Sequence, residues 1–119
     1  MTAPRLAALG LLFGVFFGST EAFAHATLVS ASPTPDSEGA APGIIQLHFS
    51  EAYEPAFSTV KLTDTDGSGV ALKAVDSKDP TTMAVAPVTP LSPGLYTVTW
   101  STVGHDTHKR TGSFSFTVK

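Results

Sequence analysis

Residues 96–118 read YTVTWSTVGHDTHKRTGSFSFTV, and two segments of this stretch alternate apolar with polar side chains. The first, 96–101, alternates Tyr, Val and Trp with Thr and Ser. The second, 113–118, alternates Phe, Phe and Val with Ser and Thr. A period of two places the apolar residues on one face of a β-strand. The stretch therefore predicts two strands on either side of a polar segment, His105-Asp106-Thr107-His108.

Shorter runs of the same kind precede this stretch. Ile45, Leu47 and Phe49 share one face of a predicted strand, and further apolar runs lie at 60–62, 70–72 and 83–85. Segments rich in Pro, Gly, Ser and Asp separate these runs, and such residues favour turns. About seven short strands and no extended helical periodicity predict an all-β domain, either a Greek-key β-sandwich or a small barrel.

The first 24 residues have the composition of a cleavable secretion signal. Arg5 gives a positive start, residues 6–17 are apolar, and Ala22-Phe23-Ala24 supplies the small residues of a signal-peptidase site. The apolar run is shorter than the roughly twenty residues that cross a bilayer, so we expect no membrane-spanning segment in the mature form. Removal of residues 1–24 would leave one domain, 25–119, of 119 minus 24 residues, with His25 at its N-terminus.

Composition limits the classes of partner. The chain has ten Asp or Glu and seven Lys or Arg, a net charge of −3, and loss of the leader removes one charge of each sign. This balance argues against nucleic acid and anionic membranes as partners. There are no cysteines, so the domain must be held by packing, and no thiolate is available to a metal. An exported domain without cysteine suggests a bacterial periplasm.

Three residues together predict a metal site. The free α-amine of His25 and its ring Nδ1 can close one chelate ring on an ion. Asp106 and His108, two residues apart, would point to the same side if their segment were extended. Three nitrogens and one oxygen in a near-planar set suit Cu(II). Zinc, which prefers a tetrahedral arrangement, is the main competitor for the same ligands.

These residues resemble the CopC family of periplasmic copper-binding proteins. The resemblance rests on His25 after a cleavage site, Asp106-Thr107-His108, His48-Phe49-Ser50-Glu51, Trp100 and Phe114-Ser115-Phe116. It implies a cupredoxin-like or immunoglobulin-like Greek-key fold with Cu(II) held by His25, Asp106 and His108. Glu51 matches a family acid close to the copper, which makes it either a weak ligand or a group that contacts the ligands.

The resemblance implies a binding protein rather than an enzyme. We expect a periplasmic carrier or buffer of Cu(II) in copper homeostasis and resistance, whose partners are the copper ion and a membrane copper transporter or another copper-resistance protein. Some family members have a methionine-rich segment that binds Cu(I). The corresponding segment here, 63–69, has no methionine, and Met83 alone remains after removal of the leader. We therefore expect a single Cu(II) site.

Other interpretations remain open at this point. The main alternative is a copper-dependent oxidase or monooxygenase that uses an N-terminal histidine site, and a third is an adhesion module without metal. His105 is expected to be a surface residue or a neighbour of the ligands, and His48 a plain surface histidine. Residues 64–68 superficially match the start of a calcium loop, but the twelfth position is Val75 instead of Glu, so a β-turn is the better account.

Overall fold

The computed structural model describes residues 28–119, which form two β-sheets and one short 3₁₀ helix, η1 (Pro55–Phe57). The first sheet has the strand order β1 (Leu28–Ser32), β3 (Ile45–Phe49), β7 (Thr82–Pro87), β6 (Leu72–Val75). The second has the order β2 (Glu38–Gly39), β9 (Lys109–Val118), β8 (Gly94–Val103), β4 (Thr59–Thr63), β5 (Gly69–Val70). The described part of the chain contains no helix of the length and apolarity that a membrane span requires.

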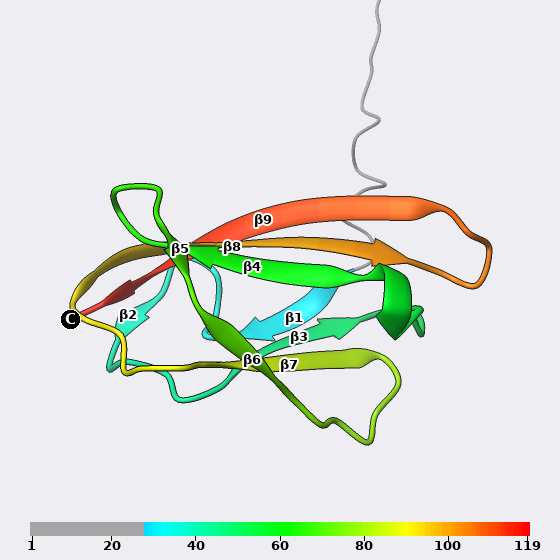
Figure 1. Cartoon of the computed structure of the whole chain (residues 1–119), viewed down its shortest axis with the longest axis horizontal. Helices are drawn as coiled ribbons and strands as arrows, with labels where there is room; N and C mark the ends of the chain where they lie inside the picture. The colour runs from blue at the N-terminus through cyan, green and yellow to red at the C-terminus, as the bar shows by residue number, and fades with distance from the viewer. Residues whose placement is uncertain (1–27) are drawn as a thin grey trace, which may run out of the picture.

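The two sheets pack face to face, and the alternation of the sequence decides which side chains lie between them (Figure 1). Ile45, Leu47 and Phe49 of β3 are at most 2% exposed. They meet Trp100 of β8, whose ring lies edge-on to Phe49 with centroids 5.1 Å apart. Gly112 of β9 is opposite Trp100, and a Cβ at this position would lie only 2.7 Å from Cε2 of the indole. The largest core side chain therefore requires glycine on the neighbouring strand.

The predicted fold class is confirmed as a β-sandwich, but two details of the prediction are wrong. The run at 70–72 is not one strand, because the chain leaves the second sheet after β5 and enters the first at β6. Apolar periodicity does not reveal a change of sheet, since both sheets face the same core. Residues 28–119 also form nine strands instead of about seven, with β1 and the two-residue β2 outside the predicted runs.

One end of the sandwich gathers several segments that are distant in sequence (Figure 1). The start of β1 lies there because Leu28 pairs with Phe49, the last residue of β3. A β-bridge between Tyr53 and Gly104 holds the β8–β9 turn against the segment that follows β3. We call this the histidine end: the start of β1, residues 48–58, the β6–β7 turn at 76–81 and the β8–β9 turn at 104–108. The β4–β5 turn and the C-terminus lie at the opposite end.

Candidate metal centre

The β8–β9 turn brings Asp106 and His108 together by a local fold of the backbone. The segment is not extended, because the N–H of Thr107 donates to the carbonyl of Gly104 at 2.9 Å and Thr107 has a φ of +66°. The extended segment that was the condition for Asp106 and His108 to share a side is therefore not present. The two side chains nevertheless converge, with Nδ1 of His108 3.4 Å from Oδ2 of Asp106. Their side chains are 76% and 47% exposed, so an ion from solvent can reach both.

Asp106 is held as a carboxylate by its surroundings. The backbone N–H of His108 donates to Oδ1 at 3.0 Å, and Nη2 of Arg110 lies 3.3 Å from Oδ2. The hydrogen bond from His108 is the main cause that lowers the pKa of Asp106, with further contributions from Arg110. Gly104 leaves room for this arrangement, since a Cβ there would lie 3.0 Å from Oδ1. The turn thus presents a negatively charged oxygen beside an imidazole.

Glu51 lies at the same end of the molecule. If β3 continued, Glu51 would share the core-facing side of the strand with Leu47 and Phe49. However, β3 ends at Phe49, and Glu51 is exposed. With Gly104 and Arg110, Glu51 lines a small pocket beside the β8–β9 turn. Arg110 also contacts Asp106, so the guanidinium that contacts Asp106 lines the same small pocket as Glu51.

The fourth predicted residue, His25, lies outside the described residues. Within residues 28–119, no group of three or more His, Cys, Asp or Glu side chains is close enough to hold a metal ion. The described part of the predicted site is therefore a pair, Asp106 and His108, with Glu51 nearby.

His105 has a separate partner. Its Nδ1 lies 3.5 Å from Oε1 of Glu54, and its side chain is 70% exposed. This agrees with the expectation of a polar surface residue.

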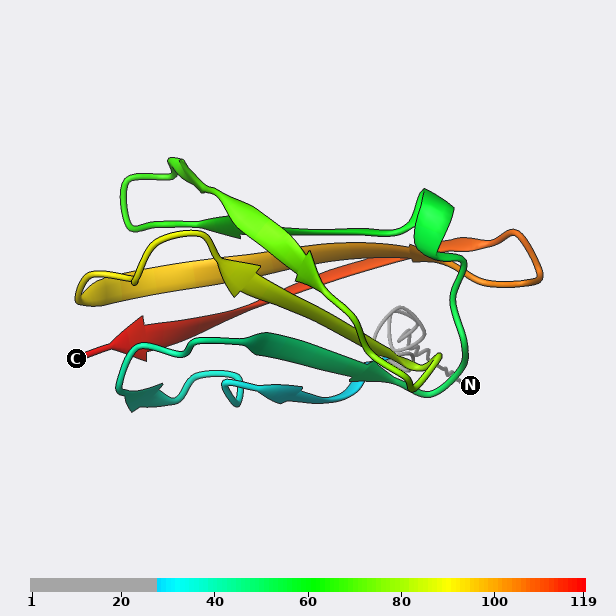
Figure 2. The same cartoon turned by 60° about the horizontal axis from the view of Figure 1, so that its bottom comes forward.

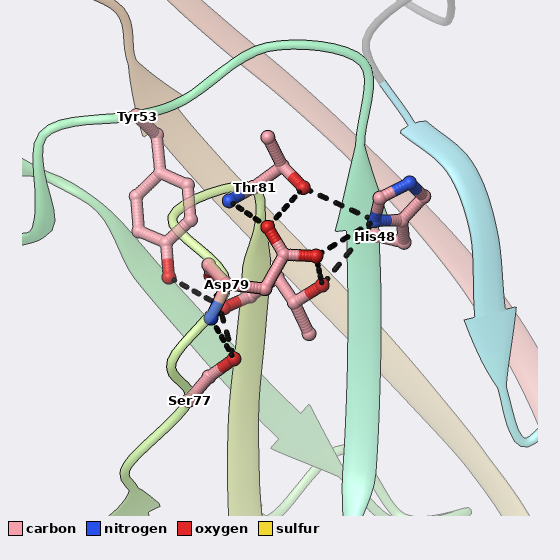
Figure 3. A network of polar contacts seen from close by, with 6 residues as sticks. His48, Tyr53, Ser77, Asp79 and Thr81 are labelled. Carbon is pink, nitrogen blue, oxygen red and sulfur yellow. Dashed lines mark hydrogen bonds and ion pairs between the residues drawn. The ribbon is translucent and has the colours of Figure 1, made fainter.

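His48 is more than a plain surface histidine, because a network of polar contacts holds it (Figure 3). Its Nδ1 lies 3.2 Å from Oγ1 of Thr82, 3.3 Å from Oγ1 of Thr81 and 4.0 Å from Oδ2 of Asp79. Both threonine hydroxyls donate to Asp79, at 2.7 and 3.1 Å. Nδ1 of His48 therefore lies beside the same two hydroxyls that donate to Asp79. Nothing in the sequence relates Asp79 to His48, so this contact could not be predicted from sequence.

The same network affects two pKa values. The backbone and side-chain hydrogen bonds from Thr81 lower the pKa of Asp79. Burial, and secondarily the charge of Asp79, raises the pKa of Tyr53, whose hydroxyl donates to the carbonyl of Thr82 at 3.2 Å. The cluster ties the β6–β7 turn to β3 and to the segment after it.

Residues 64–68 form a turn, as expected. Oδ1 of Asp64 accepts hydrogen bonds from the backbone N–H groups of Asp66 and Ser68, at 2.9 and 3.0 Å. An aspartate that closes its own turn in this way is typical of turn chemistry and needs no ion.

Comparison with known proteins places the chain in a family. The family model of the CopC domain matches residues 28–119. Copper resistance protein C of Pseudomonas syringae pv. tomato is 47% identical over 108 residues, which cover 85% of this chain and 86% of the relative. The crystal structure of PcoC from Escherichia coli, a methionine-rich copper resistance protein, superposes with a TM-score of 0.73 at 45% identity and covers 78% of this chain and 97% of that one.

A longer relative contains the same unit. Copper transport protein CutJ of Bacillus subtilis is 32% identical over 111 residues, which cover 91% of this chain but only 20% of CutJ. The fold, the family model and relatives at this level of identity agree. The chain belongs to the CopC family.

Proposed function

We propose that this protein binds one Cu(II) ion at the histidine end and acts as a copper carrier or buffer in copper homeostasis and resistance. The observation that supports this most directly is the exposed pair of Asp106 and His108, 3.4 Å apart at the tip of the β8–β9 turn. The copper resistance proteins to which the chain is similar point to the same metal.

The position of β1 supports His25 as the remaining ligand. Leu28, the first described residue, pairs with Phe49 in antiparallel register, so β1 begins at the end of the sheet where β3 ends, close in sequence to Glu51. His25 is three residues before Leu28, and three residues span at most about 10 Å. We propose, as part of the same function, that the chain is cleaved after Ala24. Cleavage would expose the amine and imidazole of His25 within about 10 Å of Leu28. Glu51 is then a weak ligand or a neighbour of the ligands.

The chemistry of the available donors favours Cu(II) over Cu(I). Amine, imidazole and carboxylate are preferred by Cu(II), whereas Cu(I) is selected by thiolates and thioethers. The chain has no cysteine, and Met83 is 9% exposed as part of the core between the sheets. We therefore propose a Cu(II) site without a methionine-rich Cu(I) site, in contrast to the methionine-rich relative PcoC.

Binding rather than catalysis is the proposed role, and a transport protein the proposed partner. In CutJ the unit similar to this chain makes up about one fifth of a copper transport protein. A separate protein of the same family would deliver copper to a membrane transporter or to another copper-resistance protein. The leader-like residues 1–24 support a periplasmic location for this function.

An electron paramagnetic resonance spectrum of the processed protein with one equivalent of Cu(II) tests the proposal. We expect a single tetragonal signal with nitrogen hyperfine structure, which reports amine and imidazole ligands. The spectrum should change in His108→Ala and stay the same in His105→Ala, a matched control on the same turn. An oxygen-only spectrum, or equal changes in both variants, would contradict the proposed site.

A further inference from the structure

A groove of about 670 Å³ opens between the two sheets, at the side where β4 and β6 face each other. Figure 2 shows β6 diverging from β4 after their connection through β5. Residues 58–60 and 72–77 form its walls, and the buried side chains of Met83 and Val85 lie at its base. Its volume is in the range of about 300–1,000 Å³ that is typical of ligand sites.

Both walls of the groove carry an open strand edge. Within the described residues, β6 pairs only with β7, and β5 covers β4 only at Leu62 and Thr63. Residues 59–61 and 72–75 therefore have no strand partner on the side of the groove. An open edge can receive an extended segment through main-chain hydrogen bonds, while pockets select alternate side chains.

The chemistry of the groove specifies the segment that it fits. Val60, Leu72 and Val75 are partly buried apolar residues along the walls, so side chains that point inward should be apolar. The polar residues that line it include three carboxylates, Glu54, Asp76 and Asp79, against one ammonium, Lys73. Side chains that point outward should therefore be basic. A second copy of the chain fits poorly, because it would bring the same acidic residues against these.

We propose that the groove between β4 and β6 binds an extended segment of a partner protein, in which apolar side chains alternate with lysine or arginine. His105 lines the groove and directly precedes Asp106, so the bound segment would lie beside the β8–β9 turn. The proposal depends on the edges and charges of the groove and does not require that the protein bind copper.

A blocked hexapeptide of alternating valine and lysine serves as the probe, titrated into the processed, metal-free protein and followed by amide NMR. We expect resonance shifts concentrated at residues 59–61 and 72–76. A peptide of alternating valine and glutamate should bind at least about tenfold more weakly, because the acidic side chains of the groove repel it. A valine-lysine peptide with N-methylated backbone amides should also lose binding, since it cannot donate to a strand edge.

Two protein variants locate the charge effect. Asp76→Lys should weaken binding of the valine-lysine peptide about fivefold, whereas Asp66→Lys, the same reversal in the β4–β5 turn at the opposite end, should change it less than about twofold. Equal binding of the two charge types, full binding of the N-methylated peptide, or shifts confined to other strands would overturn the proposal. Self-association of the chain through these edges in sedimentation would overturn it too. Because copper is absent, failure of this test leaves the copper site unaffected.

Discussion

Two of the histidine–carboxylate pairs at the histidine end both reach solvent, although His108 is 76% exposed and His48 only 43%, and their surroundings differ. His108 and Asp106 are two residues apart in one turn, with Nδ1 and Oδ2 separated by 3.4 Å. His48 and Asp79 come from different strands and turns, with a separation of 4.0 Å and two threonine hydroxyls between them. The difference teaches that proximity and exposure alone do not identify a metal site.

The partners of each carboxylate separate the two roles. Asp79 accepts from the backbone and hydroxyl of Thr81 and from the hydroxyl of Thr82, so its hydrogen bonds fix the β6–β7 turn against β3. Oδ2 of Asp106 is contacted only by the side chains of His108 and Arg110 among the described residues, and these can rotate away without disturbing a strand. We therefore expect the first pair to bind metal and the second to maintain structure.

The largest expected effect comes from removing ligands of the first pair or of the N-terminus. His108→Ala, or one extra residue before His25, should weaken Cu(II) binding more than about 100-fold. Mutation of a residue that only hydrogen-bonds a metal ligand already lowers metal affinity about 10- to 100-fold, and loss of a ligand should lower it further. The added residue converts the amine of His25 into an amide without a basic lone pair. Competition titration with a Cu(II) chelator measures both affinities.

An unchanged affinity in the extended protein would exclude the amine as a ligand. An unchanged affinity in His108→Ala would remove the distinction between the two pairs.

The next largest effect is expected on the stability of β8 and β9, the strands on either side of the turn that carries Asp106 and His108. Gly112→Ala should destabilise the fold by about 1–3 kcal/mol, the usual cost of overpacking a core, because the new Cβ meets the indole of Trp100. Gly69→Ala is the control, since nothing lies within 4 Å of a Cβ there. Urea unfolding measures both. Equal stability of the two variants would show that Trp100 can move aside.

Acidity should affect folding stability and copper affinity in separate ranges of pH. The pKa of Asp79 and that of Asp106 are lowered in the folded state. Their stabilising contribution is therefore complete above the unfolded pKa of about 3.9 and is lost as the pH falls through the lower folded value. Copper affinity should instead fall between about pH 8 and 6, as the amine and imidazoles take up protons.

Measurements of unfolding free energy and of Cu(II) affinity between pH 3 and 8 compare these ranges. Asp79→Asn should flatten the loss of stability below about pH 4 and leave the copper profile unchanged. A copper affinity that stays constant from pH 8 to 6 would contradict nitrogen ligands.

The smallest effect is expected at His48. His48→Ala should change Cu(II) affinity less than about twofold, because this side chain belongs to the second pair and lies outside the proposed ligand set. Its loss should instead expose the amides of the β6–β7 turn to faster hydrogen exchange. A large loss of copper affinity would mean that the second pair also holds the metal.

Much of the fold followed from local sequence patterns. The alternation at 45–49, 96–101 and 113–118 predicted strands whose apolar faces form the core, and the structure confirms them. The division of the run at 70–72 between two sheets could not be predicted, because both strands turn apolar residues toward one shared core. Glu51 was predicted as a site residue only from the family resemblance. The alternation of the strand alone would direct its side chain toward the core.

The sequence by itself determined what neighbouring residues decide: the β pattern, the leader-like start and the pairing of Asp106 with His108, which hydrogen bonds within one turn enforce. Only the tertiary structure decided that Asp79 meets His48, that Glu51 and Arg110 line one small pocket, and that β4 and β6 leave a groove between their edges. These contacts join residues far apart in the chain. Strand register and sheet order bring them together, and both depend on the packing of the whole core rather than on any short segment.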